Sequence, residues 1–223
     1  FSTDSIGAPH SDFDGWIIGD DPASRRVVEA GKAGKLRAAV KWGVGTDNVD
    51  FPAFEAAGVP VENTPGVFGN EVADVALTYT LGLARETYWI DRQVRDNHTW
   101  PKPAGISMTG RTVALVGFGD IGQQIATRIL ACGSHVIAYD PFFENPSNMQ
   151  VDVAEWPNRL EEADFLIFAC PLTEKTQAMF NAGIVSRLKP GVRVVNVARG
   201  PVIVDTALVE ALKSGIVESA ALD

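Results

Sequence analysis

The stretch that decides the fold is TVALVGFGDIG, residues 112–122. Its first five residues are mostly apolar, which indicates a buried strand, and residues 121–131 repeat apolar side chains with a helical period. Gly117 permits a tight turn between strand and helix, Gly119 lets a ligand approach the backbone, and Gly122 lets the helix pack closely on the strand. Phosphate oxygens are favoured at such a helix N-terminus, so the stretch predicts a dinucleotide site.

A carboxylate follows the next apolar run. Asp140 stands directly after residues 135–139 and 18 residues beyond Gly122. It is placed to accept hydrogen bonds from the adenosine ribose, and its charge would repel a 2′-phosphate. The following Pro141-Phe142-Phe143 offers no Arg or Lys, so we favour NAD over NADP. A solvated turn residue is the alternative interpretation of Asp140, and S-adenosylmethionine, bound by a similar turn, is an alternative ligand.

The composition describes a folded, acidic protein. The chain has 223 residues, of which 46% are hydrophobic and 21% charged, as in ordinary globular domains. It carries 28 acidic and 19 basic side chains, and the resulting charge of −9 argues against nucleic acid or anionic membrane surfaces as partners. Cys132 and Cys170 both lie in apolar surroundings, which favours a reducing, cytoplasmic setting. No cluster of residues with metal-ligand spacing is expected.

Short apolar runs alternate with helical segments, which is typical of a parallel α/β sheet. We expect strands at residues 15–18, 36–42, 59–62, 112–116, 135–139, 165–169, 192–197 and 219–222. We expect helices from Asp21-Pro22 to about Gly31, from Asp50 to Gly58, over residues 121–131 and over residues 205–213. Residues 70–97 contain no proline and predict one long helix, or two joined near Gly82, that bridges two domains.

Several motifs, in a fixed order, carry a resemblance to a known family. They are GVGTDNVD at 43–50, NTPG at 63–66, EVAD at 71–74, LVGFGDIG at 115–122, YDP at 139–141, CPLT at 170–173, VNVARG at 195–200 and ALD at 221–223. In this order they resemble the D-isomer-specific 2-hydroxyacid dehydrogenases of the phosphoglycerate dehydrogenase-like type. The resemblance implies an α/β fold with a Rossmann-type doubly wound sheet and a smaller, flavodoxin-like substrate domain. We expect a partial substrate domain at residues 1–72 and an NAD-binding domain at residues 73–223.

The resemblance implies hydride transfer between nicotinamide and C2 of a D-2-hydroxy or 2-oxo acid. Arg199 is the candidate catalytic residue, because its permanent charge and paired donors suit a carboxylate and a carbonyl oxygen. A surface arginine in a turn is the alternative. The resemblance adds the backbone of Val44 and Gly45 as further substrate-binding groups. An ordinary glycine turn is the alternative there.

The resemblance also assigns the cofactor's contacts. Cys170, Pro171 and Thr176 would lie near adenosine, Val197 and Ala198 beside nicotinamide, and Asp223 at the nicotinamide carboxamide. Cys170 is equally explained as a small buried residue, since no cation accompanies it in sequence. The full expected cofactor set is Gly117, Phe118, Gly119, Asp120, Ile121, Gly122, Asp140, Pro141, Cys170, Pro171, Thr176, Val197, Ala198 and Asp223.

The proton-transfer groups of the family have no match in this sequence. A Glu shortly after Asp223 and a later His would complete the set, so we expect a chain truncated at both ends and no turnover by residues 1–223 alone. His10, His98 and His135 are expected to be structural or solvated. Two carboxylates in Gly19-Asp20-Asp21 favour an unphosphorylated substrate, although the acid itself stays open.

Family members form dimers through the long helix and the loop after it, so we expect a homodimer. Trp89 and Trp100 are candidate interface residues, with core packing as the alternative. Two other functions stay open at this point: an NAD-sensing corepressor of the C-terminal-binding-protein type, and a Rossmann methyltransferase.

Overall fold

The computed structural model describes residues 12–223, so His10 lies outside the described residues. The chain divides into two compact units, residues 1–68 and 69–223, and each is described by itself. The division precedes helix α3 (Gly69–Arg85), whereas the expected boundary after residue 72 falls inside that helix.

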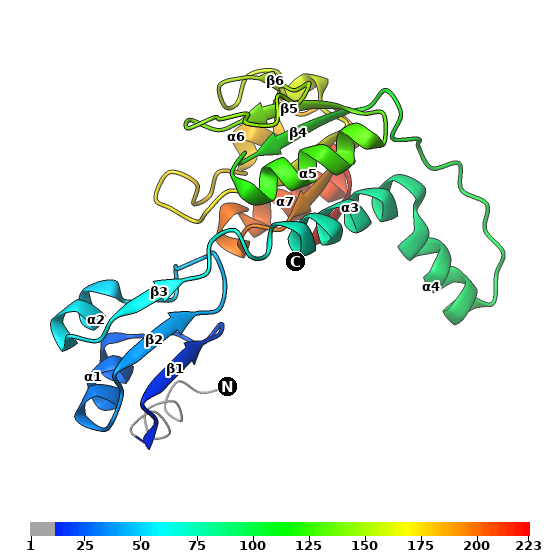
Figure 1. Cartoon of the computed structure of the whole chain (residues 1–223). Helices are drawn as coiled ribbons and strands as arrows, with labels where there is room; N and C mark the ends of the chain where they lie inside the picture. Colours follow the sequence, from blue (N-terminus) through cyan, green and yellow to red (C-terminus); the bar gives the residue numbers. More distant parts are fainter. Residues whose placement is uncertain (1–11) are drawn as a thin grey trace. The chain divides into compact units, whose positions relative to one another are not determined.

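The first unit is a three-stranded parallel sheet with two helices (Figure 1). Its strands, in spatial order, are β1 (Gly15–Ile18), β2 (Ala38–Lys41) and β3 (Val61–Asn63), and its helices are α1 (Arg25–Ala33) and α2 (Phe51–Ala57). Helix α2 is bounded as predicted: the Asp50 carboxylate accepts from the Ala53 N–H at 3.0 Å, and Gly58 ends the helix at φ 63°. Its fully buried Phe54 lies in the small core of the unit.

The start predicted for helix α1 is wrong. The helix begins at Arg25 with Ser24 as N-cap, not after Asp21, and it ends at Ala33 rather than near Gly31. The Asp21 carbonyl instead accepts from the Asn48 side chain at 2.9 Å, and Ala23 forms a parallel bridge with Val49. These long-range bonds hold the segment extended until Ser24, a competition that local capping signals do not reveal.

The second unit has a six-stranded, all-parallel sheet in the order β6-β5-β4-β7-β8-β9. The strands are β4 (Thr112–Val116), β5 (His135–Tyr139), β6 (Asp152–Val153), β7 (Phe165–Phe168), β8 (Val192–Asn196) and β9 (Val217–Leu222). Counted from β4, this is the 3-2-1-4-5-6 order of a Rossmann fold. The short β6, at one edge, was not predicted.

Helices cover both faces of this sheet (Figure 1). Along β4, Val113 and Leu115 point into a core shared with α3 and α5 (Asp120–Ala131), while Ala114 and Val116 point into a core shared with α6 (Ala182–Val185) and α7 (Asp205–Ser214). Burial on both faces explains why the strands read as continuous apolar runs. The doubly wound architecture expected from the motifs is therefore confirmed.

Residues 70–97 form two helices, but the joint is not at Gly82. Helix α3 ends at Arg85, and α4 (Thr87–Asn97) starts after Glu86, whose φ of 58° breaks the helical backbone. Gly82 has a different role: a Cβ there would collide with the Tyr88 ring, which folds back onto it. The glycine thus permits a close approach between the helices.

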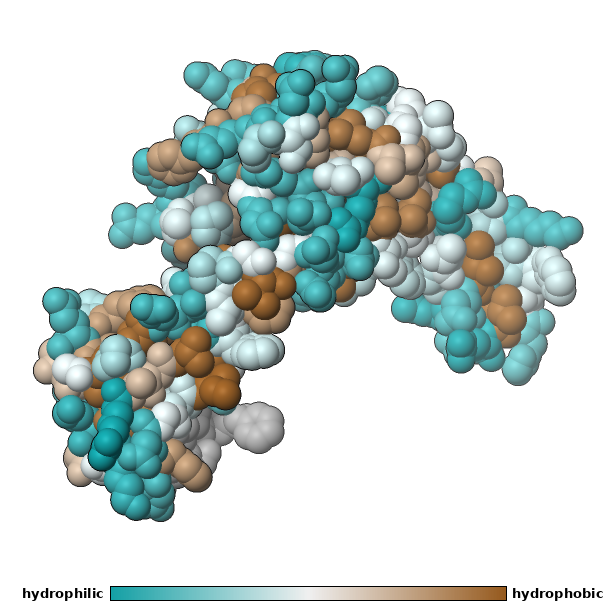
Figure 2. Space-filling model, viewed as in Figure 1, coloured by the Kyte–Doolittle hydropathy of each residue, from teal (hydrophilic) through white to brown (hydrophobic). Residues whose placement is uncertain are grey.

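Helix α4 extends away from the sheet, and the loop after it returns to β4 (Figure 1). The helix has no buried residue, and hydrophobic residues are exposed along it (Figure 2). Trp89 is 46% exposed and Trp100, in the returning loop, 84% exposed, so core packing is not their role. The loop rejoins the unit where the Ile106 N–H donates to the Ala84 carbonyl at 2.7 Å.

Asp164 joins several elements at the amino-terminal edge of the sheet. Its carboxylate accepts from the Thr112 N–H at 3.0 Å, from Lys189 at 2.7 Å and from Arg111 at 3.3 Å. Burial alone would raise the pKa of Asp164, but these hydrogen bonds and the two cations outweigh it and hold the pKa below its usual range.

No helix among residues 12–223 is long and apolar enough to cross a membrane.

Candidate functional site

The three glycines between β4 and α5 differ in their surroundings. Gly117 has φ +96°, and a Cβ there would lie 2.8 Å from backbone atoms of Ala169 and Cys170. A Cβ on Gly122 would collide with the Gly117 carbonyl oxygen, so this glycine permits close packing of helix and turn. A Cβ on Gly119 would meet nothing within 4 Å. Protein therefore fills the space beside Gly117 and Gly122, while the space beside Gly119 is open.

The N-terminus of α5 is placed to bind an anion. Gly119 is its N-cap and has no side chain to satisfy the amides of the first turn, which begins with Asp120 and Ile121. The first backbone bond across the cap is from the Gln123 N–H to the Gly119 carbonyl, at 2.9 Å. The open space at Gly119 beside these amides fits the pyrophosphate of a dinucleotide. The exposed Asp120 carboxylate lies against Gly69, at the start of α3.

Asp140 is bound to the same turn. One carboxylate oxygen accepts from the Phe118 N–H at 2.7 Å, and the other accepts from the Phe142 N–H at 2.8 Å. Asp140 is therefore more than a solvated turn residue, because it ties the end of β5 to the glycine turn. Each oxygen keeps a lone pair for a further donor such as a ribose hydroxyl. Pro141, which follows, is exposed.

The loop after β7 holds the next three predicted residues. Cys170 is buried, and burial, assisted by the Asp140 charge, raises the pKa of its thiol to about 11. The thiol is thus a packed side chain and not a nucleophile, as the alternative interpretation has it. The Thr176 hydroxyl donates to the Pro171 carbonyl at 2.6 Å and accepts from the Thr173 N–H at 2.8 Å. Thr176 therefore fixes the shape of this loop.

The end of β8 is organised by the buried Asn196. Its side-chain oxygen accepts from the Ala198 N–H, and its Nδ2 donates to the Arg199 carbonyl, both at 2.9 Å. These bonds fix the backbone of Val197 and Ala198 and the Cα position of the partly buried Arg199. A guanidinium N–H of Arg199 donates to the Ala198 carbonyl at 2.9 Å.

Asp223 follows β9 beside this turn. Its N–H donates to the Asn196 carbonyl at 2.9 Å, and its Oδ1 accepts from the Tyr79 hydroxyl of α3 at 3.3 Å. Sequence analysis did not single out Tyr79, because nothing local relates it to a residue 144 positions away. Since all strands are parallel, these residues share the carboxyl edge of the sheet with the glycine turn.

In the first unit, the glycine turn after β2 is held by hydrogen bonds to residues 63 and 64. Gly43, at φ +146°, donates its N–H to the Thr64 hydroxyl at 2.9 Å, and the Asn63 side chain donates to the Val44 carbonyl at 2.9 Å. The structure records no protein acceptor among residues 12–223 for the N–H groups of Val44 and Gly45. Two successive amides of this kind can bind an anion.

A buried lysine lies just before this turn, and sequence reasoning missed it. The Lys41 side chain is only 3% exposed, and its ammonium donates to the Gly19 carbonyl at 2.5 Å. The Asp20 carboxylate lies 3.7 Å away. Its place in the apolar run of residues 36–42 could have signalled a buried lysine, because a charged side chain is unusual in such a run.

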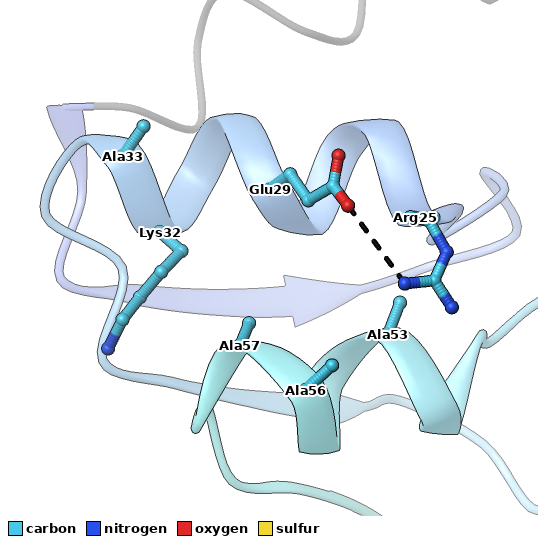
Figure 3. Close-up of a pocket in the computed structure, with 7 residues that line it drawn as sticks. All are labelled: Arg25, Glu29, Lys32, Ala33, Ala53, Ala56 and Ala57. Atoms are coloured by element: carbon cyan, nitrogen blue, oxygen red, sulfur yellow. Dashed lines mark ion pairs between the residues drawn. The ribbon is translucent and has the colours of Figure 1, made fainter.

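The two described histidines lie away from the carboxyl edge of the six-stranded sheet. His135 is exposed at the amino end of β5, opposite to Asp140, and His98 is exposed at the end of α4. A hollow in the first unit is also separate: it lies between α1 and α2 and contains none of the predicted site residues (Figure 3). Its lining residues are Arg25, Glu29, Lys32, Ala33, Ala53, Ala56 and Ala57. Within residues 12–223 no group of His, Cys, Asp or Glu is arranged to hold a metal ion.

Comparisons with known proteins agree with this geometry. Residues 77–223 match the family model described as D-isomer specific 2-hydroxyacid dehydrogenase, NAD binding domain. The chain is 37% identical over 199 residues to a hydroxypyruvate reductase of Thermotoga maritima, covering 88% of this chain and 64% of that protein. It is 37% identical over 195 residues to a D-3-phosphoglycerate dehydrogenase of Mycobacterium leprae, covering 86% of this chain and 37% of that protein.

A solved structure is similar over the whole chain. The TT0316 protein of Thermus thermophilus superposes with a TM-score of 0.90 at 30% identity, covering 100% of this chain and 72% of that one. The chain thus spans less than two thirds of the two curated relatives described above. The names of these relatives do not favour the corepressor or methyltransferase alternatives. The chain belongs to the D-isomer-specific 2-hydroxyacid dehydrogenase family, and residues 77–223 are its NAD-binding domain.

Proposed function

We propose that this protein transfers hydride between NAD and C2 of a D-2-hydroxy acid or the corresponding 2-oxo acid. The observation that carries the proposal is the geometry of the glycine turn. Other protein atoms occupy the space beside Gly117 and Gly122, whereas the space beside Gly119 is open. When bound, NAD would supply the hydride acceptor, or NADH the hydride donor, and the protein supplies binding, orientation and charge.

Asp140 selects NAD in this proposal. Its carboxylate, already bound to the Phe118 N–H, accepts from the adenosine ribose and repels a 2′-phosphate. The other proposed cofactor contacts are those of Phe118, Asp120, Ile121, Pro141, Cys170, Pro171, Thr176, Val197, Ala198 and Asp223. For Cys170 the contact is with a neutral, packed side chain, since burial keeps its thiol protonated.

Arg199 is the proposed catalytic residue. It follows the inner strand β8, and Asn196 fixes the backbone before its side chain by bonding to the Ala198 N–H and the Arg199 carbonyl. A fixed cation binds the substrate carboxylate and stabilises negative charge at the C2 oxygen during hydride transfer. In the first unit, the amides of Val44 and Gly45 are the proposed further donors to a substrate carboxylate.

We propose an unphosphorylated substrate. The Asp20 carboxylate in the loop after β1 would repel a phosphate, and its nearest recorded cation, Lys41, already donates to the Gly19 carbonyl. Affinities for glycerate, lactate and 3-phosphoglycerate, measured by calorimetry in the presence of NAD, test this point. A strong preference for the phosphorylated acid would reverse it.

The function is tested by ternary-complex formation, which needs no proton transfer. Calorimetry of the protein with NADH, then with oxamate as an unreactive 2-oxo acid mimic, measures both steps. We expect oxamate to bind only when NADH is present, and Arg199→Gln to abolish oxamate binding while NADH binding is kept. Arg187→Gln, which changes an exposed arginine of the same unit, is the matched control. Oxamate binding unchanged in Arg199→Gln would contradict the assignment.

We further propose that α4 and the loop after it form a homodimer interface. The support is the absence of buried residues on α4 together with exposed Trp89, Val94 and Trp100. Light scattering tests this: Trp89→Ser with Trp100→Ser should give monomers, and an unchanged mass would refute the interface.

A cytoplasmic location is proposed from the two unpaired cysteines, Cys132 and Cys170.

A further inference from the structure

Tyr79 joins the helix α3 to the proposed nicotinamide end of the site. The residue is partly buried, and its ring packs against the core that α3, α5 and the sheet share. Its hydroxyl leaves that core and donates to Asp223 Oδ1 at 3.3 Å. A hydrogen bond between residues 144 positions apart depends on the fold of the whole unit and not on local sequence.

Asp223 is fixed at two levels. Its backbone N–H donates to the Asn196 carbonyl at 2.9 Å, which continues the pairing of β8 with β9. Its side chain is held through Oδ1 by Tyr79, and the structure records no protein donor among residues 12–223 to Oδ2. Within residues 12–223, one carboxylate oxygen is therefore occupied, and the other can accept from a ligand N–H.

The Tyr79 hydroxyl stays a donor over the working pH range. Burial, and then the charge of Asp223 and its hydrogen bond, raise the pKa of Tyr79 above its usual value of 10.0. Tyr88 on α4 adds a smaller contribution in the same direction. The phenol therefore remains protonated at neutral pH and can donate to Asp223.

We propose that Tyr79 is a positioning residue, which orients the Asp223 carboxylate so that Oδ2 accepts the amide N–H of the nicotinamide carboxamide. This inference rests on the proposed function. Without the phenol, the exposed Asp223 side chain would rotate freely, and the acceptor would be aligned for only part of the time. Tyr79 thereby contributes to recognition of the carboxamide without touching the cofactor.

The test compares NADH with its reduced 3-acetylpyridine analogue, in which an acetyl group replaces the carboxamide and no N–H remains. Dissociation constants are measured for both by calorimetry. We expect wild-type protein to prefer NADH, and Tyr79→Phe to reduce that preference about two- to tenfold, the range of one hydrogen bond, with analogue affinity unchanged. Asp223→Ala should remove the preference, and adding Tyr79→Phe to it should have no further effect.

Tyr88→Phe is the matched control. It removes a phenol oxygen that donates to the Thr78 carbonyl at 3.2 Å and does not contact Asp223, so the preference should stay at the wild-type value. Tyr79→Leu tests for an effect of ring packing. It removes the hydroxyl together with the ring, so it must also lower the preference for NADH over the analogue.

The outcomes separate the two claims. An unchanged preference in Tyr79→Phe, with NADH still bound by the wild type, would overturn the role of Tyr79 and leave the proposed function intact. Equal weakening of both nucleotides in Tyr79→Phe and Tyr79→Leu would assign Tyr79 a purely structural role and overturn the inference. Failure of wild-type protein to bind NADH would refute the proposed function and the inference with it.

Discussion

Replacing Gly117 and Gly119 by alanine should separate the stability of the glycine turn from its binding role. At Gly117, an L-residue at φ +96° is strained by about 1–3 kcal/mol. The added methyl would also displace backbone at Ala169 and Cys170, which lie 2.8 Å from it, and overpacking of this kind adds about 1–3 kcal/mol. Gly117→Ala should therefore lower the free energy of unfolding by about 2–6 kcal/mol.

Gly119→Ala should behave in the opposite way. Its φ of −71° suits alanine, and nothing lies within 4 Å of the added methyl, so stability should stay within about 1 kcal/mol of the wild type. The methyl would stand where the pyrophosphate approaches the backbone. We therefore expect NADH affinity to fall by at least about tenfold, a loss of about 1.4 kcal/mol.

The assay is thermal unfolding by circular dichroism, paired with NADH titration calorimetry. A change of about 1 kcal/mol shifts the Tm of a chain of this size by about 2–4 °C, so Gly117→Ala should lower the Tm by about 4–24 °C. Gly119→Ala should unfold at nearly the wild-type temperature. Wild-type NADH affinity in Gly119→Ala would refute the reasoning that assigns the open space to a phosphate.

Three further predictions concern Asp140, Asp164 and Cys170. Asp140→Ala should lower the affinity for NADH more than the affinity for NADPH, and calorimetry with both nucleotides checks this. Because the substitution leaves the buried Phe118 N–H without its acceptor, it should also destabilise the folded protein by about 1–3 kcal/mol. The pKa of Asp164 is lowered in the folded state, so its stabilising contribution is present above the unfolded pKa near 4 and is lost as the pH falls through the lower, folded pKa. Asp164→Asn should therefore unfold more easily than the wild type at pH 7, and the difference in stability should shrink in acid. The Cys170 thiol should resist a disulfide reagent at pH 8 in the folded protein, since burial raises its pKa to about 11, whereas the less buried Cys132 reacts first; equal rates would contradict this.

The sequence predicts the sheet of the second unit well, for a physical reason. Strands β4 and β5 coincide with the predicted runs at residues 112–116 and 135–139, because strands buried on both faces are apolar throughout. The glycine turn was equally predictable, since Gly117 and Gly122 carry steric requirements that only glycine meets.

Features set by distant contacts were not predictable. The start of α1 depends on bonds to residues 48 and 49, and the break at Glu86 depends on how α4 folds onto Gly82. The same holds for the site: Arg199 and Asp140 stand in recognisable motifs. The Tyr79 hydroxyl and the Lys41 ammonium gain their roles only from partners far along the chain.

The most direct measurement of the central claim is a crystal structure of the protein grown with NADH. We expect the pyrophosphate at Gly119 and the first-turn amides of α5, a ribose hydroxyl on Asp140, and the nicotinamide carboxamide at Asp223. A dinucleotide bound away from the carboxyl edge of the six-stranded sheet, or no nucleotide there at saturating NADH, would contradict it.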